Sequence, residues 1–192
     1  MSLAEQKRAI RAQMRIQVNS LSSTYTALAS EKICQLLWEM PAYQNAKTVF
    51  CFVGTSREID TRLFLERVLL DQKRLCVPLC TGKGVMEARA IASLQTLCPG
   101  AMGILEPPKN ALCVPPQEID VCVVPCLAAT RQGQRLGYGG GYYDRFLPHL
   151  RANAACILVC REKMLMSSLP VESHDICFAN VVTEKTENAS RV

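Results

Sequence analysis

Short apolar runs alternate along the chain with longer segments in which apolar residues recur at helical spacing. The short runs are rich in β-branched residues, as is typical of strands that are covered on both faces. We expect strands at 48–53, 74–79, 85–91, 119–125, 155–160 and 177–182. We expect helices at about 3–18, 23–40, 61–72 and 142–151.

Local signals support two of these helices. Ser22 or Ser23 can cap the helix at 23–40, and its inward stripe consists of Ile33, Leu36, Leu37 and Met40. Asp60 or Thr61 can cap the helix at 61–72. The proline-containing passage from Pro99 to Pro116 is expected to cross the surface.

Strands that alternate with helices predict an α/β protein with three layers, α/β/α, and a predominantly parallel central sheet. At 192 residues, one domain spanning 1–192 is the expected organisation. Ligand sites in such sheets lie beyond the carboxyl ends of the strands. Glu58 and a glycine-rich segment at 137–141 each follow a predicted strand, so both are expected at this edge.

The composition indicates a soluble cytoplasmic protein with no membrane partner. Hydrophobic residues make up 49% and charged residues 20% of the chain, without a membrane-length apolar run or a signal-peptide pattern. The net charge is +5, and Lys7, Arg11 and Arg15 recur every fourth position to form a cationic stripe on the first helix.

Eleven cysteines lie mostly within apolar runs and are expected to be reduced core residues. Three pairs share a four-residue offset, namely Cys76 with Cys80, Cys122 with Cys126, and Cys156 with Cys160. A strand separates such a pair by about 13 Å, so this spacing does not favour a metal site.

The segment Arg135 to Arg145, "RLGYGGGYYDR", combines four glycines with polar chemistry. Glycines allow backbone amides to approach a ligand closely, and a helix start directly afterwards favours an anion. Neither the Walker A nor the dinucleotide-binding pattern fits, and an ordinary tight turn is the alternative. The flanking side chains point to more than a turn: Arg135 can pair with phosphate, Tyr142 and Tyr143 can stack or hydrogen-bond, and Asp144 can face a cation.

The longer segment "GQRLGYGGGYYDR", residues 133–145, resembles the signature of the 5-formyltetrahydrofolate cyclo-ligase family, also called 5,10-methenyltetrahydrofolate synthetase. Three further segments are similar to family segments in the same order: "KRAIR" near the amino terminus, "EID" after the first strand, and "PVESHD" near the end. The resemblance implies a fold like that of the NagB/RpiA/CoA-transferase group. It also implies ATP-dependent conversion of 5-formyltetrahydrofolate to 5,10-methenyltetrahydrofolate with release of ADP and phosphate.

The resemblance also implies the site residues. ATP would be bound by Lys7, Arg11, Arg135, Gly137, Gly139, Gly140, Gly141 and Tyr143. The folate would be bound by Val53, Glu58, Tyr138, Gly139, Gly140, Gly141 and Tyr142. Mg²⁺ would be held by Asp144 and Asp175, and the catalytic residues would be Arg135, Tyr142 and Asp144. The expected protein is a monomer that acts on a small molecule and binds no nucleic acid.

Other interpretations stay open at this stage. Lys7 and Arg11 could form only a solvated helix face, and Glu58 or Asp144 could only favour a helix start. Asp175 could pair with a surface cation, and His174 beside it is expected to be incidental. A basic nucleic-acid-binding module is disfavoured, because aromatic residues total 6% and do not interleave with the cationic stripe. A sugar-phosphate or CoA-ester enzyme remains an alternative on a similar fold.

Overall fold

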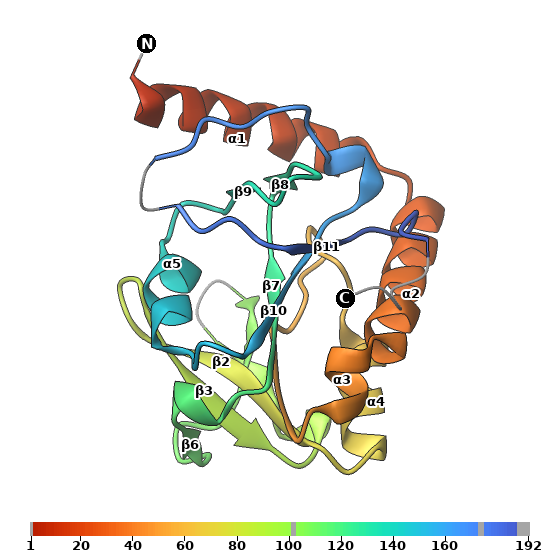
Figure 1. The fold of residues 1–192 in the computed structure, drawn as a ribbon, viewed down its shortest axis with the longest axis vertical. Helices are drawn as coiled ribbons and strands as arrows, with labels where there is room; N and C mark the ends of the chain where they lie inside the picture. Colours follow the sequence, from red (N-terminus) through yellow and green to blue (C-terminus); the bar gives the residue numbers. More distant parts are fainter. Residues whose placement is uncertain (1, 101–102, 173–174, 188–192) are drawn as a thin grey trace.

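A seven-stranded sheet runs through the centre of the protein in the order β11-β10-β7-β1-β2-β3-β6 (Figure 1). The structure is a computed structural model that describes residues 2–100, 103–172 and 175–187. The strands of this sheet are β1 (Thr48–Cys51), β2 (Arg74–Gly82), β3 (Val85–Ile91), β6 (Cys113–Val114), β7 (Val121–Pro125), β10 (Ala155–Val159) and β11 (Asn180–Val182). The pairs among β11, β10, β7, β1 and β2 are parallel, and β3 and β6 add antiparallel pairs at one edge.

Helices cover both faces of this sheet, which confirms the predicted three-layer α/β fold (Figure 1). The helices are α1 (Leu3–Ser20), α2 (Ser23–Glu39), α3 (Pro41–Asn45), α4 (Arg62–Leu70) and α5 (Tyr142–Phe146). Side chains alternate across the sheet, as strand geometry requires. On β1, Val49 and Cys51 pack towards α2, α3 and α4, whereas Phe50 packs towards α1 and α5.

The local signals predicted for α2 and α4 are confirmed. The predicted inward stripe of α2 is buried throughout, and the Ser22 hydroxyl accepts a hydrogen bond from the Tyr25 amide. Before α4, Thr61 occupies the cap position, but it is the Asp60 carboxylate that accepts a hydrogen bond, from the Arg62 amide. Strand β3 has the predicted bounds.

Several predicted elements differ from the structure in their bounds, among them the strands expected at 74–79 and 177–182, which span Arg74–Gly82 and Asn180–Val182. The helix expected at 142–151 ends at Phe146 and continues as a 3₁₀ turn, Leu147–His149, because Pro148 has no amide hydrogen for the helical ladder. The strand expected from residue 119 begins at Val121, since the Ile119 amide is bound by Pro116 in the turn Pro116–Glu118. Within the surface passage, β6 pairs with β3 and extends the sheet.

The remaining elements are short. Two small antiparallel pairs lie outside the central sheet, formed by β4 (Cys98–Pro99) with β5 (Leu105–Glu106) and by β8 (Ala128–Ala129) with β9 (Arg135–Leu136). The other 3₁₀ turns are Leu94–Thr96 and Glu162–Met164. No helix among the described residues has the length and apolarity needed to cross a membrane.

All eleven cysteines are free. The prediction of core packing is confirmed for Cys34, Cys51, Cys76, Cys122 and Cys160. It is wrong for the exposed residues Cys80, Cys98, Cys113 and Cys177. Most of the confirmed residues lie in or directly after central strands, where a small apolar side chain fits between the sheet and its helices.

Candidate active site

The order of the strands reverses between β1 and β7. From β1 the chain adds β2, β3 and β6 on one side, and it then returns to add β7, β10 and β11 on the other. Ligands bind at such a switch point, beyond the carboxyl ends of the strands. A narrow pocket lies there, and its lining includes Phe52 after β1, Pro125 and Cys126 at the end of β7, and Cys160 and Arg161 after β10.

Glu58 and Tyr138 also line this pocket, so the structure brings together two of the predicted folate residues. The loop after β1 carries Glu58, whose carboxylate accepts a 3.1 Å hydrogen bond from the Thr55 amide. Burial raises the pKa of Glu58, and the Thr55 hydrogen bond and the Arg161 charge only partly oppose this. Burial likewise raises the pKa of Tyr138. A carboxyl and a phenol therefore face a poorly solvated pocket.

The glycine-rich segment follows β9 and leads into α5. Gly139 has φ +104° and Gly141 has φ +67°, conformations that favour glycine. Within the described parts of the chain, no group accepts a hydrogen bond from the backbone amides of residues 137–141. These five donors are therefore unpaired within the described structure. Because α5 has only five residues, an anion at this loop would be held by the loop amides more than by a helix dipole.

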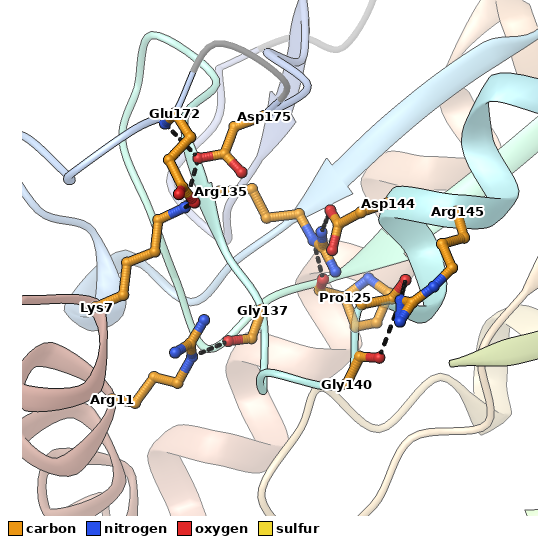
Figure 2. Close-up of polar contacts among 11 residues, drawn as sticks. Lys7, Arg11, Pro125, Arg135, Gly137, Gly140, Asp144, Arg145, Glu172 and Asp175 are labelled. Carbon is orange, nitrogen blue, oxygen red and sulfur yellow. Dashed lines mark hydrogen bonds and ion pairs between the residues drawn. The ribbon is translucent and has the colours of Figure 1, made fainter. Parts of the chain in front are cut away.

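Two arginines from different elements brace this loop (Figure 2). Arg11 of α1 donates through Nε to the Gly137 carbonyl at 2.9 Å. Arg135 donates through Nε to the Pro125 carbonyl at 3.0 Å, and its guanidinium lies 5.4 Å from the centre of the Tyr143 ring. The predicted ATP residues Arg11 and Arg135 are therefore both at the loop.

The third predicted phosphate residue, Lys7, sits in an acidic cluster at the edge of the same region (Figure 2). Its Nζ lies 2.6 Å from Glu172 Oε2 and 2.7 Å from Asp175 Oδ2. Burial alone would lower the pKa of Lys7, but the hydrogen bonds and charges of Asp175 and Glu172 outweigh it and raise this pKa. Lys7 is thus no solvated helix residue, because it is buried and joins α1 to the chain near residue 175.

The two predicted magnesium ligands are each paired with a predicted phosphate ligand. Asp144 Oδ1 accepts from the Arg135 guanidinium at 2.8 Å, and Asp175 accepts from Lys7. No group of three or more His, Cys, Asp or Glu side chains suited to a metal occurs in the described part of the chain. His174 lies outside the described residues.

The other predicted site residues, Tyr142, Tyr143 and Val53, differ in how deeply they are buried. Tyr142 is half-buried and its ring lies against Gly140, at the surface of the loop. Tyr143 is buried beneath the loop against Phe50, and among the described residues no group pairs with its hydroxyl. Val53 packs partly against the core on the α2 side of the sheet. Tyr143 therefore presents less surface to a ligand than Tyr142 does.

Three residues in this region were missed from the sequence. Arg161 is buried and donates to the carbonyls of Arg57, at 3.0 Å, and of Glu58. Arg145 covers the loop by donating to the Gly141 carbonyl at 2.9 Å, and Glu172 shares Lys7 with Asp175. The signal for Arg161 was available, because a cation directly after a buried strand lies at the site edge.

The class of fold is shown by a solved structure. The chain superimposes on 5,10-methenyltetrahydrofolate synthetase from Aquifex aeolicus with a TM-score of 0.84 and 29% sequence identity, covering 97% of this chain and 93% of that one. This match confirms a mixed α/β protein built on a large, mostly parallel sheet.

The family follows from the sequence. A model described as the 5-formyltetrahydrofolate cyclo-ligase family matches residues 3–184, and the chain belongs to this family. It is 43% identical over 136 residues to 5-formyltetrahydrofolate cyclo-ligase of Mycolicibacterium smegmatis, covering 69% of this chain and 65% of the relative. It is 30% identical over 169 residues to the mitochondrial enzyme of that name from Arabidopsis thaliana, covering 80% of this chain and 61% of the relative. The chain thus spans less than two thirds of the length of these two relatives.

Proposed function

We propose that this protein catalyses the ATP-dependent cyclisation of 5-formyltetrahydrofolate to 5,10-methenyltetrahydrofolate, with release of ADP and phosphate. The observation that carries this proposal is the group of five unpaired backbone amides at 137–141, braced by Arg11 and Arg135 and next to the pocket of Glu58 and Tyr138. Membership of the cyclo-ligase family supports the substrate.

The chemical difficulty of this reaction is the formyl group, whose oxygen is a poor leaving group. Transfer of the γ-phosphoryl group of ATP to the formyl oxygen breaks the bond to ADP and activates the formyl carbon. The neighbouring amine nitrogen then attacks this carbon, and phosphate leaves as the ring closes. Phosphoryl transfer depends mainly on alignment and charge neutralisation, so a site made of amides and cations is suited to it.

The proposal assigns a role to each candidate site residue. The amides of the loop and the cations Lys7, Arg11 and Arg135 bind and align the phosphates. Tyr142, on the loop surface, borders the folate at the reacting group, and Arg135 and Asp144 flank the transferred group. Val53, Glu58 and Tyr138 hold the folate, and Glu58 acts by positioning it rather than as a base. Tyr143 supports the loop from below.

Mg²⁺ is part of the proposal, and the chemistry of the donors fits it. Asp144 and Asp175 supply carboxylate oxygens from two segments, and the Asp144 side chain is 43% exposed, which leaves room for the waters that Mg²⁺ retains. Mg²⁺ would neutralise phosphate charge. Asp144 and Asp175 would hold Mg²⁺, and Lys7 and Arg135, which pair with these carboxylates in the structure, would then be free to bind the phosphates.

The setting of the enzyme is also proposed. We propose that residues 1–192 act as one domain, because the central sheet unites strands from β1 to β11. A monomeric cytoplasmic enzyme with no nucleic-acid or membrane partner is consistent with the composition.

A turnover assay tests the function directly. Purified protein with Mg-ATP is expected to convert 5-formyltetrahydrofolate to a product with new absorbance in the near ultraviolet, and no product is expected without ATP. Arg135→Ala is expected to weaken ATP binding and slow turnover. Arg74→Ala, at an exposed ion pair with Glu118, is the matched control and is expected to behave as wild type. Absence of product from folded protein would contradict the proposal, and an unchanged Arg135→Ala variant would contradict the phosphate site.

A further inference from the structure

The four-residue spacing of cysteines recurs in two neighbouring strands, β7 and β10 (Figure 1). These strands pair in parallel, with Cys156 opposite Cys122 and Val159 opposite Pro125. Continuing this register places Cys160 beside Cys126. Neighbouring strands lie about 4.8 Å apart, within the Cα separations of about 4.4 to 6.8 Å that disulfides span. The two cysteines within one strand are thus far apart, but each lies beside a cysteine of the neighbouring strand.

The pair Cys126 and Cys160 lies at the pocket of the candidate active site. Both residues line this pocket, and Cys126 is half-buried whereas Cys160 is only 2% exposed. The Cys126 thiol donates to the Val159 carbonyl at 3.3 Å, and the Cys160 thiol donates to the Arg161 carbonyl at 3.4 Å. The neighbouring Cys126 thiol and, to a smaller extent, burial raise the pKa of Cys160. Because Cys126 is the more exposed of the two, it is the thiol that a reagent from solvent reaches first.

We propose that Cys126 and Cys160 form an oxidation site, which hydrogen peroxide or an organic hydroperoxide converts to a disulfide. The Cys126 sulfur, as thiolate, attacks one peroxide oxygen, the O–O bond breaks, and water or an alcohol leaves, so that Cys126 becomes a sulfenic acid. The Cys160 sulfur then loses its proton and attacks the Cys126 sulfur, which releases water. In total two thiols lose two electrons and two protons, and one peroxide is reduced.

The disulfide would change the pocket in two ways. It would remove both S–H donors, including the one bound to the Arg161 carbonyl, and it would join the carboxyl ends of β7 and β10 covalently. Arg161 holds the backbone of the loop that carries Glu58. We therefore expect oxidation to weaken folate binding. This consequence rests on the proposed function, whereas formation of the disulfide does not.

Peptide mapping tests the disulfide itself. The full chain is treated with hydrogen peroxide, free thiols are alkylated, and the digest is analysed by mass spectrometry. The expected product is a linked pair of peptides containing Cys126 and Cys160, which dithiothreitol separates. Cys126→Ser is expected to abolish this product. Cys156→Ser, at the second cross-strand pair, is the matched control and is expected to retain it.

Two results would overturn the proposal. One is alkylation of both Cys126 and Cys160 under conditions that oxidise the exposed Cys98 and Cys113. The other is a link from Cys126 to any different cysteine.

Calorimetric titration with 5-formyltetrahydrofolate tests the consequence. Oxidised wild type is expected to bind at least about fivefold more weakly than reduced protein, a typical size for coupling between linked sites, and reduction is expected to restore affinity. Peroxide-treated Cys126→Ser is expected to show no such loss relative to its untreated form. Equal affinity of oxidised and reduced wild type would overturn the effect on binding. Failure of even the reduced protein to bind would count against the proposed function, and the peptide map would still decide the disulfide.

Discussion

Lys7 and Asp175 are 168 positions apart in the sequence, and their charged groups lie 2.7 Å apart. Arg135 and Asp144 repeat this relationship at 2.8 Å within the glycine-rich segment. In both pairs the cation is a proposed phosphate ligand and the carboxylate a proposed metal ligand. In each pair, a proposed phosphate ligand and a proposed metal ligand therefore hold each other in position. Substitution of the cation tests the role of each pair.

Lys7→Met is expected to weaken ATP binding by about tenfold or more, because a charge-assisted hydrogen bond contributes about 1.5 to 3 kcal/mol. Calorimetric titration with ATP and Mg²⁺ measures this change. Arg8→Met, at the exposed neighbouring position on α1, is the control and is expected to bind ATP almost as wild type does. Equal losses of ATP affinity in the two variants would show that Lys7 contributes only general positive charge.

Gly139→Ala is expected to destabilise the loop by about 1 to 3 kcal/mol, because a side chain at φ +104° is strained even where space is available. The expected result is weaker ATP binding with an intact fold, measured by titration and by circular dichroism. Gly82→Ala is the matched control: its φ is not in the left-handed region and an added Cβ would meet only Val85, at 3.8 Å. If both variants bound ATP as wild type, the conformation of Gly139 would be irrelevant to the site.

Glu58→Gln is expected to stabilise the fold at neutral pH while weakening folate binding. Burial raises the pKa of Glu58 above its ordinary value of 4.5, so the folded state holds its proton more tightly than the unfolded state. Stability therefore falls as the pH rises through 4.5 towards the folded-state pKa, and Gln removes this loss. Urea unfolding at about pH 4 and about pH 7 measures the difference between variant and wild type, which should grow with pH. The exposed Glu66→Gln serves as control, and a difference independent of pH would contradict the buried-carboxylate explanation.

Arg161→Lys is expected to raise the KM for folate several-fold and to leave the KM for ATP nearly unchanged. A lysine keeps the charge, but it lacks the planar group that binds the carbonyls of Arg57 and Glu58 together. Steady-state kinetics with each substrate varied in turn measures this split. Arg62→Lys, at an exposed position of α4, is the comparison. Parallel rises in both KM values would indicate general damage to the site rather than positioning of the Glu58 loop.

Periodicity in the sequence was sufficient to predict the layers of this fold. Strands such as β1 are apolar on both faces because helices cover both, and that pattern is local. The loop at 137–141 was also predictable from local pattern. Its donors are backbone amides in one continuous glycine-rich segment, so no contact with a distant segment had to be known. The premature end of α5 was also predictable, because Pro148 stands within the expected helix.

Pairings between distant segments could not be predicted from local pattern. The contact of Lys7 with Glu172 and Asp175 depends on where α1 lies against a segment near the other end of the chain. The cysteine pairs depend on the register of β7 with β10, which no spacing within one strand reveals. Tyr143 is buried rather than exposed because of the direction in which the short α5 leaves the loop, which the sequence does not reveal.

The ion pairs at the loop have a consequence for selectivity. Lys7 and Arg135 already pair with three carboxylates, so neither cation is free to pair with a small anion such as chloride. An anion can bind these cations only if it displaces the carboxylates, which requires more negative charge, spread over more oxygens, than the carboxylates carry. In the proposed site, this competition would favour anions of high valence, such as a triphosphate, over monovalent ions.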